Sequence, residues 1–213
     1  MTTAIIFDFD GVIANSEPLH HRAFEETLAP ENLVMPWKDY VGTYIGYDDR
    51  GAFRLRYKNS GRKLDDAKLA ELIEKKAEAF QHLLQVTGVR PYPGVLDLIA
   101  RARAKGLPVG LCTGALRSDI TPILASLNIA DSFACIATAE DVSAGKPDPA
   151  GYVLAVRQLG ISARTSIAIE DTPAGIEAAK GAGLKVVAVT NSYGRDKLFG
   201  ADRIVATLEN FRL

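Results

Sequence analysis

The stretch Ala4-Ile-Ile-Phe-Asp-Phe-Asp-Gly11 joins a short continuous apolar run to two acids that stand two residues apart. A continuous apolar run is typical of a parallel strand that is covered on both faces. Further runs of this kind recur along the chain and are separated by helical stretches, which predicts a doubly wound, Rossmann-like parallel α/β sheet. The predicted strands lie at residues 4–8, 107–112, 133–137, 166–169, 185–189 and 203–205.

Amphipathic stretches between these runs predict helices that cover the two faces of the sheet. The clearest start signal is Thr172-Pro173, which places an N-cap hydroxyl before a proline at the first helical position. Glycines at positions 106, 160 and 183 close three of the four stretches, as is common at helix C-termini. The predicted helices of the sheet layer span residues 95–105, 118–127, 150–159 and 172–182.

One long segment breaks the alternation of strands and helices. It shows no strand pattern, whereas a crossover between parallel strands needs a single helix. We therefore predict an inserted α-helical cap domain at residues 16–88, with the α/β core formed by residues 1–15 and 89–213. The predicted cap helices span residues 17–28, 37–44, 48–58 and 65–86.

Composition excludes several classes of protein. The 213 residues include 47% apolar residues, which excludes a fully disordered chain, and 25 Lys and Arg balance 26 Asp and Glu. This balance argues against partners such as nucleic acid or an anionic membrane. No apolar run approaches the roughly 20 residues that span a bilayer, and the N-terminus lacks a signal-peptide pattern. We therefore expect a cytoplasmic protein, in which Cys112 and Cys135 are buried, reduced thiols.

Polar side chains stand just past several predicted strands. In open α/β sheets, ligands bind outside the carboxyl ends of the strands, so these side chains are expected to share one edge of the sheet. Residues i and i+2 of an extended segment point the same way, so Asp8 and Asp10 can face one site. The other candidates at this edge are Thr113, Gly114, Lys146, Glu170 and Asp171.

Four converging carboxylates would repel one another and raise one another's pKa values. A divalent cation removes this conflict, and Mg²⁺ binds one or two carboxylates together with waters and a substrate phosphate. Lys146 supplies a positive charge for such a phosphate, and the hydroxyl of Thr113 supplies a hydrogen-bond donor. The pattern therefore predicts Mg²⁺ as cofactor and a phosphorylated ligand.

Four segments resemble the ordered motifs of the haloacid dehalogenase superfamily: residues 8–13, Thr113-Gly114, Lys146-Pro147 and residues 170–175. The helical insert directly after the first motif resembles the subgroup that contains β-phosphoglucomutase and phosphoglycolate phosphatase. The resemblance implies a phosphatase that hydrolyses a small phosphorylated metabolite. The alternatives are a phosphosugar mutase of the β-phosphoglucomutase type and, in another class, a non-catalytic protein that binds phosphometabolites.

The resemblance also implies roles for the core residues. Asp8 would be the nucleophile that forms an aspartyl-phosphate, and Asp10 would be the general acid and base. Thr113 and Lys146 would be catalytic residues that hold the phosphoryl oxygens. Gly114, Ala115 and Arg117 would contact substrate, and Asp8, Asp10 (through its carbonyl), Glu170 and Asp171 would form the metal site, with Glu170 either a direct ligand or behind the ligands.

Asp10 separates branches of the superfamily, because dehalogenase and phosphonate-cleaving relatives lack an acid at this position. On the predicted cap, Glu17, His20 and Arg50 are candidates for substrate binding. Where the mutases place an arginine that binds a distal phosphate, this chain has Asp49, which argues against a bisphosphate mutase cycle. A cap that swings also favours a monomer.

Other cap residues are expected to have structural roles. Their charges are expected to lie in solvent and their aromatic rings to pack, with one ring as a further candidate for the pocket. The charged residues are Arg54, Arg56 and Lys76, and the aromatic residues are Trp37, Tyr40 and Tyr44.

Overall fold

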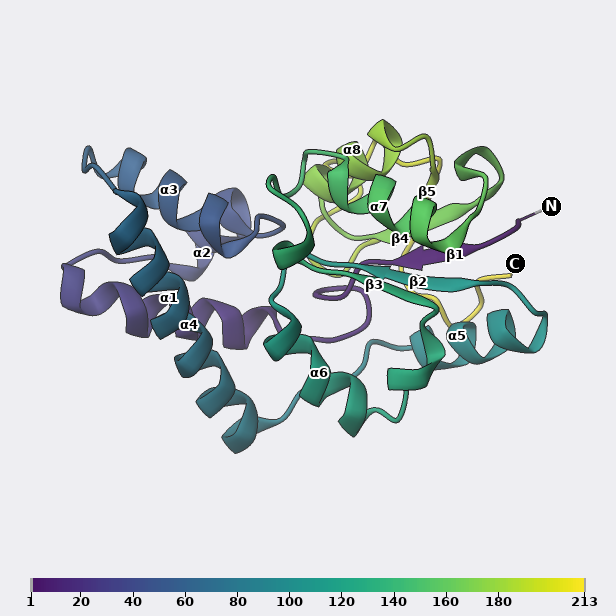
Figure 1. Ribbon diagram of the computed structural model, residues 1–213, viewed down its shortest axis with the longest axis horizontal. Helices are drawn as coiled ribbons and strands as arrows, with labels where there is room; N and C mark the ends of the chain where they lie inside the picture. The colour runs from purple at the N-terminus through teal and green to yellow at the C-terminus, as the bar shows by residue number, and fades with distance from the viewer. Residues whose placement is uncertain (1, 213) are drawn as a thin grey trace.

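A six-stranded parallel sheet lies between two helical layers in the computed structural model, which describes residues 2–212 (Figure 1). The strand order is β3-β2-β1-β4-β5-β6, and every neighbouring pair is parallel. This confirms the predicted α/β fold class. The strands are β1 (Ile5–Phe7), β2 (Val109–Cys112), β3 (Cys135–Ala137), β4 (Ile167–Glu170), β5 (Lys185–Val189) and β6 (Arg203–Val205).

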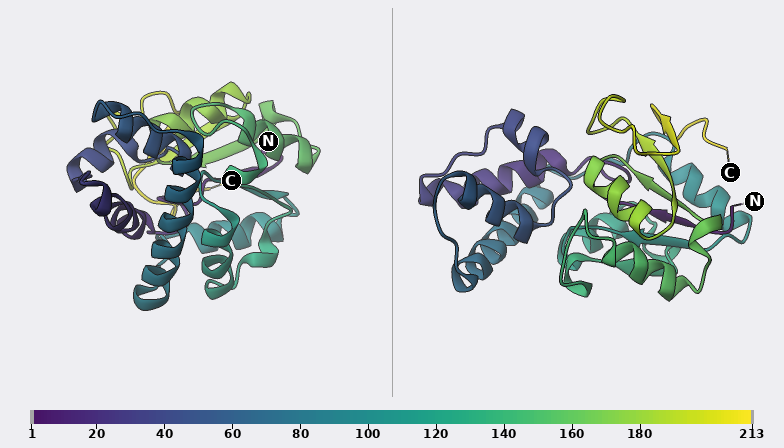
Figure 2. Two further views of the ribbon diagram at one scale, coloured as in Figure 1. Left: turned by 60° about the vertical axis from the view of Figure 1, so that its left-hand side comes forward. Right: turned by 90° about the horizontal axis from the view of Figure 1, so that it is seen from above.

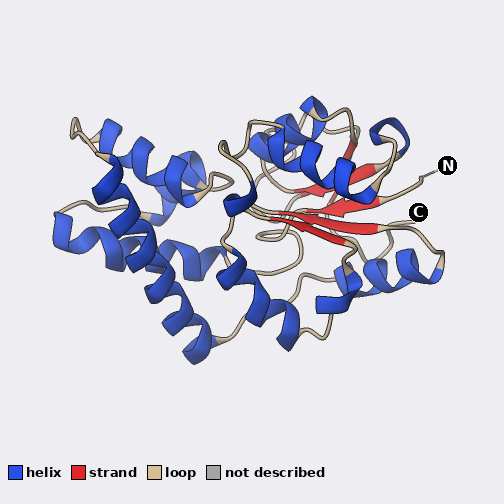
Figure 3. Cartoon of the chain, in the orientation of Figure 1, coloured by secondary structure: helices blue, strands red, loops and turns tan. Residues whose placement is uncertain are grey.

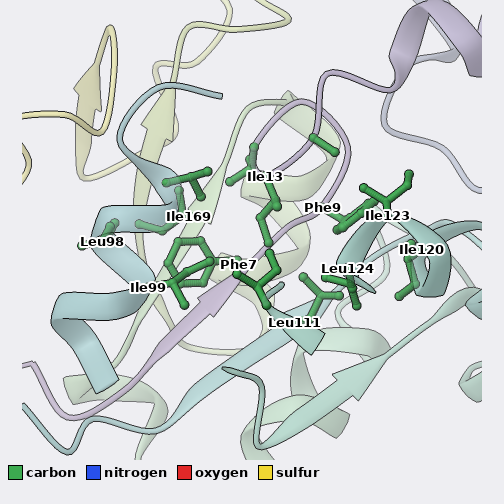
Figure 4. Close-up of a cluster of buried hydrophobic side chains, with 14 of the residues drawn as sticks. Phe7, Phe9, Ile13, Leu98, Ile99, Leu111, Ile120, Ile123, Leu124 and Ile169 are labelled. Atoms are coloured by element: carbon green, nitrogen blue, oxygen red, sulfur yellow. The ribbon is translucent and has the colours of Figure 1, made fainter. Parts of the chain in front are cut away.

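Each face of the sheet is covered by one pair of helices (Figure 3). Because side chains alternate along a strand, Ile5 and Phe7 point into one apolar cluster and Ile6 into the other. The first cluster contains the apolar faces of α5 and α6 (Figure 4), and the second contains those of α7 and α8. These helices are α5 (Val95–Ala104), α6 (Arg117–Ser126), α7 (Ala150–Leu159) and α8 (Pro173–Gly181).

The helices inserted between β1 and α5 pack around an apolar cluster of their own, at one end of the molecule (Figure 2). Within residues 17–87 the structure shows helices and no strand, as predicted, although the domain boundaries themselves stay a prediction. The helices are α1 (Glu17–Leu28), η1 (Ala29–Glu31), α2 (Trp37–Asp39), η2 (Tyr40–Tyr44), α3 (Asp49–Asn59) and α4 (Asp66–Thr87).

The helix predicted over residues 37–44 is present, but it is not a regular α-helix along its length. A three-residue α-helical turn leads into a π-helical segment, closed by a hydrogen bond from the amide of Ile45 to the carbonyl of Tyr40 (3.0 Å). Gly42 and the β-branched Val41 and Thr43 are poor helix formers, which favours this wider turn. The other predicted helices and strands agree with the structure to within two residues.

The two connections between the inserted helices and the sheet lie side by side. The amide of Asn15 donates to the carbonyl of Arg90 (3.0 Å), and an isolated bridge pairs Ala14 with Pro91. The chain therefore leaves and re-enters the sheet layer at one place, where paired connections can act as a hinge.

Cys112 and Cys135 are both buried and form no disulfide, as predicted. Among residues 2–212, no helix combines the length and the apolar character needed to cross a membrane.

The central strand generates a stability prediction. Phe7 is fully buried in the first cluster, whereas Phe199 is 85% exposed. Phe7→Ala is expected to lower the free energy of unfolding by about 3–5 kcal/mol, because it removes buried apolar surface and leaves a cavity. Phe199→Ala is expected to change it by less than about 0.5 kcal/mol. Urea denaturation of both variants checks this, and equal losses would contradict the assigned core.

Candidate active site

A buried lysine joins two carboxylates at the carboxyl edge of the sheet. Lys146 lies in the loop before α7, and its ammonium donates to Asp8 Oδ1 (2.5 Å) and Glu170 Oε1 (2.6 Å). All three residues are less than 10% exposed. Burial alone would lower the pKa of Lys146, but the charges of Asp8 and Glu170 outweigh it and hold this pKa well above its usual value. Lys146 is therefore a permanent cation.

The nucleophile candidate remains short of positive charge despite this lysine. Burial raises the pKa of Asp8 well above its usual value, and Lys146 opposes this effect, whereas Glu170 and Asp10 add to it. One ammonium shared between two carboxylates does not neutralise both. A further cation would favour the ionised form of Asp8.

Asp8, Glu170 and Asp171 form a buried acidic cluster in which one oxygen of each lies within 4.8 Å of the others. Burial and then the charges of Asp8 and Glu170 raise the pKa of Asp171 well above its usual value. Asp171 Oδ2 accepts a hydrogen bond from Ser192, but within residues 2–212 its buried Oδ1 has no partner. An unpaired buried carboxylate oxygen among three acids fits a hard divalent cation such as Mg²⁺.

Gly11 makes room for this cluster. It adopts φ +80°, which favours glycine, and a Cβ at this position would lie 1.9 Å from Asp171 Oδ2. Its amide donates to the carbonyl of Ala14 (2.9 Å), and its carbonyl accepts from Asn191 (2.7 Å). The turn after Asp10 therefore needs glycine both for its backbone and for the space beside Asp171.

Glu170 differs from its neighbours because both of its oxygens have hydrogen-bond partners. Tyr152 donates to Oε1 (2.7 Å) beside Lys146, and the amide of Asp171 (3.1 Å) and the hydroxyl of Thr172 (3.3 Å) donate to Oε2. Gly175, at the start of α8, provides the space, since a Cβ there would lie 2.0 Å from this carboxyl group. The side chain is thus held in one orientation.

Asp10 accepts hydrogen bonds from both parts of the molecule. Ser16 and His20 Nε2 (3.1 Å) bind its Oδ1, and the Thr113 hydroxyl lies 3.5 Å from its Oδ2. Burial alone would raise the pKa of Asp10, but His20, Ser16 and Lys76 together lower it below its usual value. Ser16 is the N-cap residue of α1, yet its hydroxyl binds Asp10 and not the helix amides. This ties the first inserted helix to the catalytic candidate.

Lys76 on α4 is fully buried, so the expectation that it lies in solvent is wrong. Its ammonium contacts Asp49 Oδ1 (2.9 Å) and His20 Nδ1 (2.8 Å), and it lies 3.8 Å from Asp119 Oδ2 on α6. An ammonium has no lone pair, so Nδ1 of His20 is the acceptor and the proton of its ring lies on Nε2, toward Asp10. A charged network therefore runs from α4 to Asp10.

A further buried carboxyl group, that of Glu17, lies beside this network. Tyr40 in η2 donates a hydrogen bond to Glu17 on α1, whose pKa is raised to about 7 by burial and by the charge of Asp10. The Tyr40 ring packs against Trp37, His21 and Phe24. Tyr40 therefore combines the predicted packing role with a place at the pocket.

These groups open into one cavity between the sheet edge and the inserted helices. The predicted residues Asp8, Asp10, Glu17, His20 and Lys146 all line it. Thr113, Glu170 and Asp171 stand behind them. The complete lining is Asp8, Asp10, Glu17, His20, Phe24, Tyr40, Gly46, Tyr47, Asp49, Gly114, Ala115, Lys146 and Thr172.

The structure places the two predicted arginines outside this lining. The guanidinium of Arg50 binds Asp48 (2.8 Å) and donates to the carbonyls of Ala139 (3.0 Å) and Val142 (3.1 Å) beyond β3. That of Arg117 binds Asp141 (3.0 Å) and the carbonyl of Ile136 (3.2 Å). Their hydrogen bonds are with the protein itself, so the prediction that they contact substrate is not supported by their positions.

Sequence reasoning missed several residues of the site, including Ser16, Asp49, Tyr152 and Ser192. For Lys76 a signal existed: it stands on the apolar stripe of α4, four residues after Leu72 and four before Phe80. A lysine inside such a stripe predicts a buried, paired cation. Nothing comparable marks Tyr152 and Ser192, because their partners Glu170 and Asp171 lie 18 and 21 residues away. Ser16 lies six residues from its partner Asp10, but no local pattern distinguishes this contact from an ordinary N-cap.

The family model of the haloacid dehalogenase-like hydrolases matches residues 5–189. Protein CbbY of Rhodobacter capsulatus is 34% identical over 203 residues, which cover 93% of this chain and 89% of that protein. A phosphoglycolate phosphatase of Yersinia pseudotuberculosis is 30% identical over 210 residues, which cover 97% and 89%. The crystal structure of CbbY from Rhodobacter sphaeroides in complex with phosphate matches with a TM-score of 0.88 and 27% identity, over 99% of this chain and 96% of that chain.

The two adjacent lysines of α4 allow a matched test. Lys76→Met leaves the buried carboxyl groups of Asp49 and Asp119 without their cation and is expected to cost about 3–5 kcal/mol of unfolding free energy. Lys75 pairs with Glu71 in solvent, so Lys75→Met is expected to cost less than about 1 kcal/mol. Chemical denaturation measures both, and similar values would show that the Lys76 network does not stabilise the fold.

Proposed function

Because the chain belongs to the haloacid dehalogenase-like hydrolase family, we propose that it is a Mg²⁺-dependent phosphatase that hydrolyses a small phosphate monoester. One observation carries the proposal: Asp8 is bound to Lys146 and faces, with Asp10, a cavity beside a buried acidic cluster. The proposed substrate is a sugar phosphate or a similar metabolite, bound between the sheet edge and the inserted helices.

The proposed metal site comprises the carboxylates of Asp8 and Asp171 and the carbonyl of Asp10. The unpaired Oδ1 of Asp171 supports this assignment. Glu170 has partners on both oxygens, so we assign it to positioning Lys146 and the backbone of Asp171. Bound Mg²⁺ would offset the repulsion between Asp8 and the phosphate and stabilise the charge that moves in the transfer.

In the proposed first step, an Asp8 oxygen attacks phosphorus, and the bond from phosphorus to the ester oxygen breaks. The leaving oxygen takes a proton from Asp10, which yields an alcohol and an aspartyl-phosphate. A dianionic phosphate beside Asp10 raises its pKa and so favours the protonated form that this step needs. Lys146 and the Thr113 loop hold the phosphoryl oxygens.

In the second step, Asp10 accepts a proton from water while the water oxygen attacks phosphorus. This releases inorganic phosphate and regenerates Asp8 as a carboxylate, so that the protons balance over the cycle. The donors around Asp10 favour its carboxylate form, which is the base required here. Packing of the inserted helices over the cavity would exclude bulk water.

The mutase alternative requires the phospho-enzyme to meet a sugar hydroxyl before water. With Asp49 in the cavity lining and Arg50 bound to backbone carbonyls, the lining residues from 17 to 49 include no arginine or lysine to hold a second phosphate. This supports the phosphatase. The binding-protein alternative is disfavoured by the paired Asp8 and Asp10, which binding alone does not require.

Asp8→Asn is expected to lower kcat for p-nitrophenyl phosphate by at least about a thousandfold, because an amide is not a nucleophile for phosphorus. Release of p-nitrophenol measures this rate. The control is Asp39→Asn, which removes the same charge from an exposed position on α2 and is expected to retain wild-type activity. Activity retained by Asp8→Asn would remove the nucleophile assignment.

Metal removal gives an independent test. Exhaustive chelation is expected to abolish turnover, and added Mg²⁺ is expected to restore it. A saturating Mg²⁺ concentration of about 100 times Kd is expected to stabilise the wild type by about 2.7 kcal/mol, and Asp171→Asn by much less. Thermal unfolding with and without Mg²⁺ measures the shift. Full activity after chelation, or equal shifts in both proteins, would contradict the proposed metal site.

A further inference from the structure

The cavity has two chemically different ends. At the sheet edge lie Asp8, Asp10 and Lys146, which we have assigned to the phosphate. The opposite end, here called the cap end, is formed by the lining residues from 17 to 49. They include the carboxyl groups of Glu17 and Asp49 and the phenol rings of Tyr40 and Tyr47. This end must contact whatever the phosphate is attached to.

Asp49 has an unused hydrogen-bond acceptor at the cap end. Its side chain is only 12% exposed, and Oδ1 accepts from Lys76. Among the residues that the structure describes, Oδ2 has no partner, although it is buried. A buried carboxylate oxygen without a donor is unfavourable, and a bound ligand can remove this cost by donating a hydrogen bond. Because Asp49 lines the cavity, a ligand bound there is a candidate for this missing donor.

The nearest cations are committed to protein groups. Lys76 is fully buried behind Asp49 and divides its contacts between Asp49, His20 and Asp119. Arg50 binds Asp48 and two backbone carbonyls. Within residues 2–212, the lining of the cap end therefore holds no lysine or arginine with a free donor for an anion.

We propose that Asp49 determines the specificity of the cap end: it accepts a hydrogen bond from a hydroxyl or ammonium group of the substrate and excludes a second phosphate. The substrate class is then a monophosphate whose far end is a polyol or an amino polyol. This inference rests on the proposed phosphatase function. It adds a preference that phosphoryl chemistry at Asp8 does not require.

The test measures competitive inhibition of p-nitrophenyl phosphate turnover, which works whether or not a compound is itself hydrolysed. Glucose 6-phosphate offers hydroxyls, glucosamine 6-phosphate adds an ammonium, and fructose 1,6-bisphosphate carries a second phosphate. The variants are Asp49→Asn, which keeps an oxygen for Lys76, and Asp49→Ser, which removes the charge with a smaller side chain. Asp39→Asn is the matched control, since it removes one charge from the exposed surface of α2.

In the wild type, the bisphosphate is expected to inhibit at least about tenfold less well than glucose 6-phosphate, because its second phosphate meets a carboxylate. Asp49→Asn is expected to lower the ratio of the inhibition constants of fructose 1,6-bisphosphate and glucose 6-phosphate by about tenfold or more, whereas Asp39→Asn leaves this ratio unchanged. If the favoured donor is a hydroxyl, the inhibition constant of glucose 6-phosphate for Asp49→Asn stays within a few-fold of the wild-type value. If the favoured donor is an ammonium, Asp49→Asn is expected to bind glucosamine 6-phosphate about tenfold more weakly than the wild type does, while its affinity for glucose 6-phosphate changes less.

Two results would overturn the inference. One is a wild type that binds the bisphosphate better than both monophosphates. The other is a ratio of inhibition constants that neither Asp49 variant alters. Turnover of p-nitrophenyl phosphate by both variants shows in that case that they are folded. A wild type that hydrolyses no phosphate monoester would instead refute the proposed function, and this inference with it.

Discussion

The ammonium of Lys146, buried between Asp8 and Glu170, is the contact on which the arrangement of the site depends. Without a cation, carboxylates brought together by parallel strands would repel one another in a water-poor environment. Lys146 reaches them because α7 packs against β2 and β3 and directs the preceding loop back over the sheet edge. Tyr152, on the same helix, anchors Glu170. The core packing on this face therefore determines where the positive charge lies.

A second buried ammonium has the corresponding role among the inserted helices. Lys76 on α4 connects Asp49 on α3, His20 on α1 and Asp119 on α6, so that one charge joins three inserted helices to a helix of the sheet layer. His20 then contacts Asp10. Any motion that separates the inserted helices from α6 must alter the surroundings of Lys76, and through His20 those of Asp10. The inserted helices, α6 and Asp10 therefore share one connected set of polar contacts.

Much of the fold and of the core site follows from local sequence. The continuous apolar runs specify the strands, and strand-end residues such as Asp8 and Asp171 meet because all the strands run parallel. The cap residues were harder to predict, since a side chain there reaches the site only through contacts between helices. Arg50 illustrates this: its charge suggested a phosphate ligand, whereas carbonyls 89 and 92 residues away satisfy its guanidinium. No local pattern encodes such a pairing.

The residues proposed to react with the phosphate and those proposed to select the substrate lie in different parts of the molecule. Asp8 and Asp171 directly follow strands of the sheet, and Lys146 is held against Asp8 and Glu170 from the loop before α7. A small shift there would disturb the geometry that we propose for phosphoryl transfer. The cap end is built from α1, η2 and the start of α3, which are connected to the sheet layer through two paired segments. Residues there can change while the strand ends stay as they are. Within residues 2–212, the carboxylate at position 49, which we propose selects the accepted group, has no hydrogen bond or ion pair with the strand-end residues and is connected to Asp10 only through Lys76 and His20.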